Sequence, residues 1–138
     1  IRMGDPECQV LMMRLKTDLL ELIDRATKNE LNNFKIEWRK DSCITIVLCA
    51  NGYPGKYIKN SEIKNLPFIK QDENNQIFHA GTYEKNKKIF SSGGRVLNIT
   101  SLGKNLVLAR DKSLLNLKKI KWDDGFYRKD IGWRALKK

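Results

Sequence analysis

The sequence has few of the residues that a disulfide framework or a zinc site requires. Among 138 residues there are only three cysteines and one histidine, with no Cys-x-x-Cys pair. Cys43 and Cys49 lie on one expected strand with about 20 Å between their Cα atoms, far beyond the limit of about 7 Å for a disulfide. The odd cysteine count and the missing ligand pairs argue against disulfides and zinc, and we expect a reducing, cytoplasmic compartment.

Long apolar runs are also absent. No stretch approaches the roughly 18 residues of a membrane-spanning helix, so we expect a soluble chain with no membrane partner. The sequence begins with neither an initiator methionine nor a signal peptide, and we expect it to be a fragment of a longer protein. Its length fits one domain, or one domain and part of another.

Acidic residues are outnumbered, which gives a net charge of +11. Such a charge is common in nucleic-acid-binding proteins, because neutralising phosphates drives their affinity. Here the lysines are scattered and mixed with acids, and arginine-rich helices and aromatic ribonucleoprotein motifs are lacking. We therefore do not expect a nucleic-acid partner, although a small basic nucleic-acid-binding or structural domain without catalysis is the alternative interpretation. A positive field would also attract small anionic substrates.

The clearest strand pattern of the chain is the uncharged run Ser42–Ala50. It is followed directly by Asn51-Gly52-Tyr53-Pro54-Gly55. Its β-branched and apolar residues predict a strand covered on both faces. Proline fixes φ and glycine permits positive φ, so the chain must turn sharply after the strand. This turn is either an ordinary one or a rigid loop that holds a ligand.

The first 35 residues predict the end of a strand and then helix. Asp5 is suited to an N-cap, Pro6 to the first helical position and Glu7 to the positive end of the helix dipole. A break near Lys16, with Thr17 as a second cap, would give two short helices. The apolar stripe expected to be core comprises Met12, Leu15, Leu19, Leu22, Ile23 and Ala26.

The remaining residues predict mainly strands. After a polar boundary segment, Phe34, Ile36 and Trp38 form an alternating pattern. The further expected elements are a short piece at 63–67, strands at 76–82, 88–90 and 95–100, a helix at 104–119 and a hairpin-like turn at 122–127. The inward set of strand 95–100 is either Val96, Asn98 and Thr100 or the more apolar Leu97 and Ile99. Ser101 and Gly103 predict a turn and a cap before the helix at 104–119. Its expected buried residues are Leu106, Ala109, Leu114 and Leu117. Strands that cluster beside one flanking helix predict a mainly antiparallel α+β domain over 36–138.

Three loops place polar groups beside glycines. They are Gly52-Tyr53-Pro54-Gly55, Phe78-His79-Ala80-Gly81-Thr82 and Gly93-Gly94-Arg95. Glycine lets a ligand approach the backbone, and the arginine guanidinium binds phosphate or carboxylate in a fork, although glycine pairs also make simple hairpin turns. His79 is interpreted as a hydrogen-bonded structural residue or, with a partner, as a general base.

Read together, these segments resemble one enzyme family. The similar strings are residues 2–7, 14–19, 52–55, 78–82, 93–103 and 127–136, and they occur in order along nearly the whole chain. The sequence resembles the C-terminal portion of glycinamide ribonucleotide synthetase (phosphoribosylamine–glycine ligase). The resemblance implies that residues 1–35 close an ATP-grasp domain, as a strand plus helices, and that 36–138 form the small C-terminal domain.

That family is an ATP-dependent carbon–nitrogen ligase of de novo purine synthesis. The resemblance implies joining of glycine to 5-phosphoribosylamine through a glycyl phosphate, with ATP cleaved to ADP and phosphate and with Mg²⁺, or Mn²⁺, required. The Glu-x-Asn pair that holds the metal in the family would lie just upstream of Ile1, so no metal ligand is expected within this chain. We therefore expect the chain alone to be inactive.

The resemblance also implies roles for particular residues. Arg2 would lie near the acyl phosphate, or else form a structural salt bridge. Asp5 would bind the amine of glycine or phosphoribosylamine, or else cap the helix. Further substrate-binding residues are expected to be Glu7, Gly52, Tyr53, Pro54, His79, Gly81 and Thr82, with Gly93, Gly94 and Arg95 at the ribose phosphate. Arg128, Asp130 and Arg134 are expected to form an internal ion-pair lock.

Overall fold

The computed structural model describes residues 2–136, whose strands form two antiparallel sheets. The larger sheet has the order β3-β6-β1-β7 and the smaller one β2-β5-β4. The strands are β1 (Ser42–Ala50), β2 (Glu62–Ile63), β3 (Asn75–His79), β4 (Thr82–Lys85), β5 (Lys88–Ser91), β6 (Arg95–Gly103) and β7 (Gly125–Phe126). The helices are α1 (Glu7–Arg14), α2 (Leu19–Thr27), α3 (Leu106–Lys119) and α4 (Trp133–Leu136), with a 3₁₀ turn, η1, at Leu66–Phe68.

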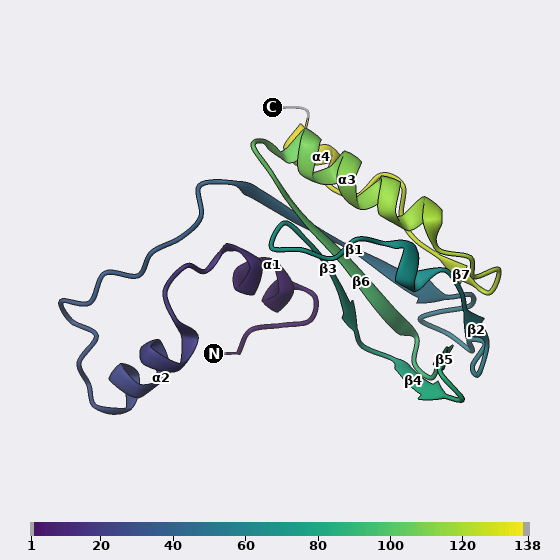
Figure 1. The fold of residues 1–138 in the computed structure, drawn as a ribbon, viewed down its shortest axis with the longest axis horizontal. Coiled ribbons are helices and arrows are strands. Elements are labelled where there is room, and N and C mark those ends of the chain that lie inside the picture. The colour runs from purple at the N-terminus through teal and green to yellow at the C-terminus, as the bar shows by residue number, and fades with distance from the viewer. Residues whose placement is uncertain (1, 137–138) are drawn as a thin grey trace.

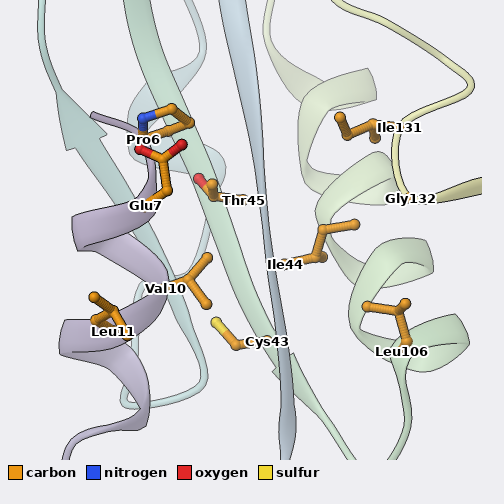
Figure 2. A pocket seen from close by; sticks show the side chains of 10 residues that line it. All are labelled: Pro6, Glu7, Val10, Leu11, Cys43, Ile44, Thr45, Leu106, Ile131 and Gly132. Carbon is orange, nitrogen blue, oxygen red and sulfur yellow. The ribbon is translucent and has the colours of Figure 1, made fainter. Parts of the chain in front are cut away.

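The long antiparallel pair of β1 and β6 is the centre of the fold (Figure 1). Helix α3 packs against both strands, and α1 also packs against both. The two helices lie on opposite sides of β1 (Figure 2). The mainly antiparallel α+β architecture and the bounds of β1 predicted from the sequence are confirmed.

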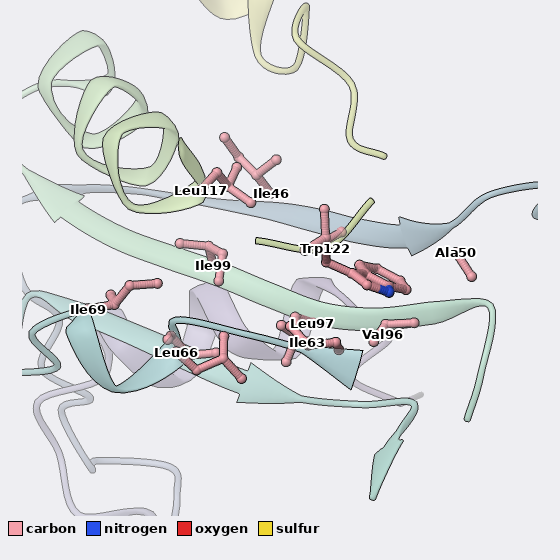
Figure 3. Packing of buried hydrophobic residues seen from close by; sticks show 12 residues of the cluster. Ile46, Ala50, Ile63, Leu66, Ile69, Val96, Leu97, Ile99, Leu117 and Trp122 are labelled. Carbon is pink, nitrogen blue, oxygen red and sulfur yellow. The ribbon is translucent and has the colours of Figure 1, made fainter. Parts of the chain in front are cut away.

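The core lies on the face of the sheet that α3 covers (Figure 3). Cross-strand pairing places Ile46 beside Ile99 and Leu48 beside Leu97, and each of these side chains is buried. Leu117 of α3 packs into the same cluster. This arrangement confirms Leu97 and Ile99 as an inward set of β6.

The opposite face of the sheet is covered less evenly. On β1, buried residues alternate with half-buried ones, so both faces are covered as predicted, but the α1 face only in part. On β6, by contrast, both candidate sets are buried, including Asn98 and Thr100. Thr100 Oγ1 donates to Thr45 Oγ1 across the strand pair at 2.7 Å, which satisfies the hydroxyls on this face.

Helix α3 begins at Leu106, two residues after the expected start at 104. Ser101 and Gly103 belong to β6, which continues further than predicted, and the Asn105 side chain instead accepts a hydrogen bond from Leu108 N at 2.9 Å. Ala109 and Leu117 are buried as expected, whereas Leu106 and Leu114 are only half-buried. A serine, Ser113, occupies the third buried position and donates to Ser101 Oγ at 2.9 Å.

The N-terminal segment forms two short helices, as predicted, but with different caps. Asp5 makes no capping hydrogen bond at α1, and no strand precedes that helix within the described residues. Asp18 caps α2 by accepting from Glu21 N at 3.0 Å, while Thr17 Oγ1 accepts from Glu37 N.

The expected core stripe of these helices is wrong for α2. Met13 is the buried residue of α1, and α2 buries none, with Leu19 37% and Ile23 51% exposed. The reason is that α2 lies away from the sheet, where the described residues do not cover it (Figure 1). The strand expected from Phe34 to Trp38 is also not formed; Trp38 makes an isolated bridge with Leu15.

Two later predictions are corrected in detail. The strand expected over 76–82 ends at His79, and β4 starts after a turn at Ala80 and Gly81. The segment at 122–127 is not a hairpin, because its strand β7 pairs with the end of β1 instead of folding back on its own neighbours. The short ordered piece at 63–67 and the strand at 88–90 correspond to β2, η1 and β5.

The C-terminal segment is held by an arginine that sequence reasoning did not single out. Arg110 of α3 donates through Nε to Ile131 O at 3.0 Å and through Nη2 to Lys129 O. Arg128 and Asp130 do pair, at 2.8 Å, but their side chains are 68% and 55% exposed. They form a local surface pair, and Arg134 instead lies over the Trp133 ring at 5.4 Å, so the expected internal lock of these three residues is wrong.

Candidate functional site

The three glycine loops converge at one end of the large sheet. Gly93 N donates to Gly81 O at 3.2 Å, and Gly81 N donates to Arg95 O at 3.0 Å. Gly94 O accepts from Ala50 N at 2.8 Å at the end of β1. A Cβ atom on Gly94 would lie 2.2 Å from Tyr53 Cδ2, so the tyrosine ring lies directly on this glycine. The prediction that these loops form one locality agrees with these contacts.

The first loop needs glycine for its own geometry. Gly52 has φ of 94°, in the left-handed region, and a Cβ atom there would lie 2.0 Å from Lys56 O. The turn therefore returns the chain tightly behind Tyr53. Its position after β1 lets Tyr53 reach the Gly94 turn.

An ion pair joins α1 to this cluster of turns. Arg95 Nη2 lies 3.3 Å from Asp5 Oδ2, and Arg95 Nη1 donates to the backbone Asp5 O at 3.1 Å. The two side chains are 43% and 38% exposed, so both charges are reachable from solvent. The carboxylate that sequence reasoning assigned to either a helix cap or an amine is thus used across the fold, against Arg95.

Asn98 is a partner of Asp5 that the sequence patterns did not reveal. It is fully buried, and its Nδ2 donates to Asp5 Oδ1 at 3.4 Å. From the sequence it was considered only as a position in a strand. The signal that could have found it is the presence of an amide among apolar residues of a buried strand.

The second loop carries the only histidine. His79 is exposed, and its Nδ1 lies 2.9 Å from Thr82 Oγ1, across the turn that contains Gly81. The hydrogen bond fixes the ring at the edge of the cluster. It is the partner that the structural interpretation of His79 required.

The third loop offers fewer free amides than expected. Ser92 N and Gly93 N both donate to Gly81 O, at 2.8 and 3.2 Å. Of this turn, the Gly94 N–H makes no hydrogen bond to another described residue. Gly94 is itself buried beside the Tyr53 ring, so an anion placed here would meet the Arg95 guanidinium in place of a nest of several free amides.

Two residues expected at the site lie outside its polar cluster. Arg2 is exposed and makes no hydrogen bond or ion pair with the residues that the structure describes. Glu7 is exposed at the start of α1 and faces a neighbouring apolar cavity (Figure 2). The structure therefore brings Asp5 and Arg95 together but leaves Arg2 and Glu7 without a polar partner in the described chain.

Two apolar cavities lie beside the cluster, along β1. One, of about 340 Å³, is lined by residues that include Pro6, Val47, Tyr53 and Pro54. The other, of about 440 Å³, lies between α1 and the segment around Ile131 (Figure 2). Both have predominantly apolar walls, although Glu7 lines the larger cavity and Arg128 the smaller one.

The cysteines near these cavities are poorly suited to nucleophilic chemistry. Burial raises the pKa of the Cys43 thiol to about 11, opposed in part by the positive charge of Arg14. Burial also raises the pKa of Cys49, opposed by Arg95. Since the thiolate is the reactive form, both groups are protonated at neutral pH. All three cysteines are free.

The described residues contain no group of three or more histidine, cysteine, aspartate or glutamate side chains able to hold a metal ion. They also contain no helix that is long and apolar enough to cross a membrane. The chemistry available here is recognition of charge by an exposed guanidinium and an exposed carboxylate beside rigid glycine turns.

The sequence was compared with known families. The family described as "Phosphoribosylglycinamide synthetase, C domain" matches residues 43–134. The chain belongs to this family. The resemblance seen in the sequence motifs is thereby confirmed.

Individual relatives align over nearly the whole chain. The phosphoribosylamine–glycine ligase of Agrobacterium fabrum is 46% identical over 136 residues, covering 99% of this chain and 32% of the relative. The chloroplastic ligase of Arabidopsis thaliana is 46% identical over 139 residues, covering 99% and 26%. The crystal structure of the Thermotoga maritima ligase superposes with a TM-score of 0.71 at 31% identity, covering 94% of this chain and 31% of that one. The chain thus spans about a quarter to a third of the length of these relatives.

Proposed function

We propose that this chain forms the C-terminal part of an ATP-dependent ligase that joins glycine to 5-phosphoribosylamine in de novo purine biosynthesis. Family membership and the names of the aligned relatives support this proposal. The observation that carries it is the meeting of Asp5 with Arg95, 90 positions apart, beside three converging glycine turns.

The charge pair suits one substrate in particular. In the absence of ligand, Arg95 and Asp5 neutralise each other at 3.3 Å. A molecule that carries both a phosphate and an amine, as 5-phosphoribosylamine does, exchanges this internal pair for two pairs of its own. Arg95, next to Gly94 in the turn, then binds the phosphate, and Asp5 binds an amine, either of this substrate or of glycine.

The other proposed contacts surround that pair. Arg2 approaches the activated carboxylate of glycine as an acyl phosphate, since a guanidinium stabilises charge that develops on transferring phosphoryl oxygens. The remaining substrate-binding residues that we propose are Glu7, Gly52, Tyr53, Pro54, His79, Gly81, Thr82 and Gly93. His79 and Thr82 are already oriented by their mutual hydrogen bond.

The described residues do not fit a metal site, because they hold no group of three or more histidine, cysteine, aspartate or glutamate side chains for a cation. We propose that Mg²⁺, or Mn²⁺, and most contacts to ATP belong to preceding ligase sequence. Residues 1–35 would then close the ATP-grasp domain and 36–138 form the C-terminal domain, in a cytoplasmic enzyme. On this proposal the 138-residue chain alone forms no ADP.

A chimera tests the proposed function directly. This chain replaces the last third of the Agrobacterium fabrum ligase, with the intact ligase as control. We expect the chimera to form ADP only when both glycine and phosphoribosylamine are present. A folded chimera that forms no ADP, or forms it without glycine, would contradict the proposal. If instead this chain binds duplex DNA with a steep salt dependence, the nucleic-acid interpretation is favoured.

A further inference from the structure

We propose that Asn98 is a positioning residue of this site. From its buried position on β6, it fixes the orientation of the Asp5 carboxylate toward Arg95. The inference rests on the proposed function and extends it to a residue that touches no substrate itself. Three features support the inference: an irregularity in the pairing of β6, the burial of the Asn98 side-chain amide, and the different donors that contact the two carboxylate oxygens of Asp5.

The irregularity is a β-bulge in β6. On β1 the consecutive residues Leu48 and Cys49 pair with Leu97 and Arg95, so Val96 is an extra residue on β6. In a regular strand Arg95 and Asn98, three positions apart, would point to opposite faces. The bulge adds one residue and places both on the α1 side, while Val96 joins Leu97 in the core. Without it, Arg95 would not meet Asp5.

Burying the side-chain amide of Asn98 in the sheet costs free energy. The residue is 0% exposed, and its Oδ1 is buried without a hydrogen-bond partner among the described residues. Leaving a buried acceptor unpaired is unfavourable, and a valine or leucine would avoid that cost at this position of the strand. The compensating interaction is the one that Nδ2 makes with a charged acceptor, Asp5 Oδ1, at 3.4 Å.

The two carboxylate oxygens of Asp5 contact different donors. Oδ2 lies against Arg95, and Oδ1 accepts from Asn98 Nδ2 and also from Gln9 Nε2 at 3.1 Å. Asn98 is the one of these three donors that is fully buried, so its place is set by the sheet and not by solvent. It therefore fixes the orientation in which Asp5 meets Arg95 and an incoming amine.

The kinetic test uses the chimera described above. Asn98→Leu keeps the approximate shape of the side chain and removes the donor. We expect the KM of the substrate whose amine Asp5 binds, glycine or phosphoribosylamine, to rise about tenfold or more. The KM of ATP should change less than about twofold. Asn98→Asp, which sets a second carboxylate against Asp5, should raise the same KM further. If Asn98→Leu fails to fold, Asn98→Ala removes the donor with a smaller side chain and should raise the same KM.

Thr100→Val is the matched control. Thr100 has the same burial on the same face of β6, but it bonds to Thr45 and not to Asp5. We expect it to lower thermal stability without changing either KM. If the Asn98 variants change stability only, or raise the KM of ATP equally, Asn98 has a structural role and the proposal is wrong.

A second readout does not depend on ligase activity. In this chain, labelled with ¹⁵N, the side-chain NH₂ resonances of Asn98 should shift when Asp5 is replaced by Asn, and Glu7→Gln should leave them unchanged. No shift with Asp5→Asn would overturn the contact and hence the inference. An inactive unsubstituted chimera, in contrast, would count against the proposed function while this measurement still decides the place of Asn98.

Discussion

Gly81 and Gly93 lie with their backbones in direct contact. A Cβ atom on Gly81 would be 2.6 Å from Gly93 Cα and 2.7 Å from Gly93 N. The two residues belong to different turns, one between β3 and β4 and the other between β5 and β6. Because no side-chain rotation relieves an overlap with backbone, this contact fixes the distance between the His79 turn and the turn that leads to Arg95.

Gly81→Ala should therefore lower the free energy of unfolding by about 1–3 kcal/mol, the usual cost of overpacking. Equilibrium urea denaturation of the 138-residue chain measures the change. Gly55→Ala is the control, because its nearest neighbour, Gly52 O, lies 3.3 Å away at an exposed turn. Equal and small effects of the two substitutions would show that the turns are not held by close glycine packing.

Arg95→Ala should raise the KM of phosphoribosylamine in the chimera by about 10- to 100-fold. A hydrogen bond to a charged group contributes about 1.5–3 kcal/mol, and each 1.4 kcal/mol corresponds to a factor of ten. Arg95→Lys keeps the charge without the fork and should recover part of the loss.

Arg39→Ala is the matched control for Arg95. Arg39 forms an ion pair with Glu73 at 3.3 Å, the same separation as the Arg95–Asp5 pair, but away from the glycine turns. We expect its KM values to equal those of the unsubstituted chimera. A similar rise in both variants would mean that Arg95 acts through general charge rather than through contact.

Local patterns predicted most strands of this fold because their signals are local. The uncharged run of β1 and the glycine-bounded start of β6 each mark a strand within its own segment. The glycine turns were likewise recognised as candidate ligand loops. Their convergence depends on strand pairing between distant segments, and in the sequence only the family resemblance linked them.

Other features were not predictable from the same patterns. Asp5 fits an N-cap locally, but Arg95 and Asn98, 90 and 93 positions away, provide its partners. The bulge at Val96 is a single extra residue in the pairing, and alternation of residue types does not reveal it. The apolar stripe on α2 indicates that this face of the helix favours burial. It does not indicate whether any of the described residues pack against that face.

The difference between the predicted and observed core gives a direct test. Ile46 is 1% exposed at the centre of the core, whereas Ile23 on α2 is 51% exposed. Ile46→Ala should cost about 2–5 kcal/mol, through lost burial and the cavity left behind. Ile23→Ala should change the free energy of unfolding by less than about 0.5 kcal/mol, as exposed substitutions usually do. Chemical denaturation of the free chain compares the two, and similar costs would mean that α2 is packed after all.

The thiol of Cys43 should react slowly in the folded chain. Burial raises its pKa from 9.0 to about 11. At pH 8 the thiolate fraction is then roughly 100-fold lower than in the unfolded chain, and alkylation by iodoacetamide should slow by a similar factor. Peptide mapping by mass spectrometry, with and without urea, measures the rate at Cys43 separately from the other cysteines.

The same shift predicts how stability depends on pH. Because the pKa is higher in the folded state, the unfolded chain loses the Cys43 proton first as the pH rises. The stabilisation from keeping this thiol neutral is complete below pH 9 and is lost progressively as the pH passes through about 11. Cys43→Ser removes this contribution, so the difference in Tm between the unsubstituted chain and the variant should shrink from pH 8 to pH 10.5. A difference that stays constant over this range would show that the thiol is not shielded from water beside α1.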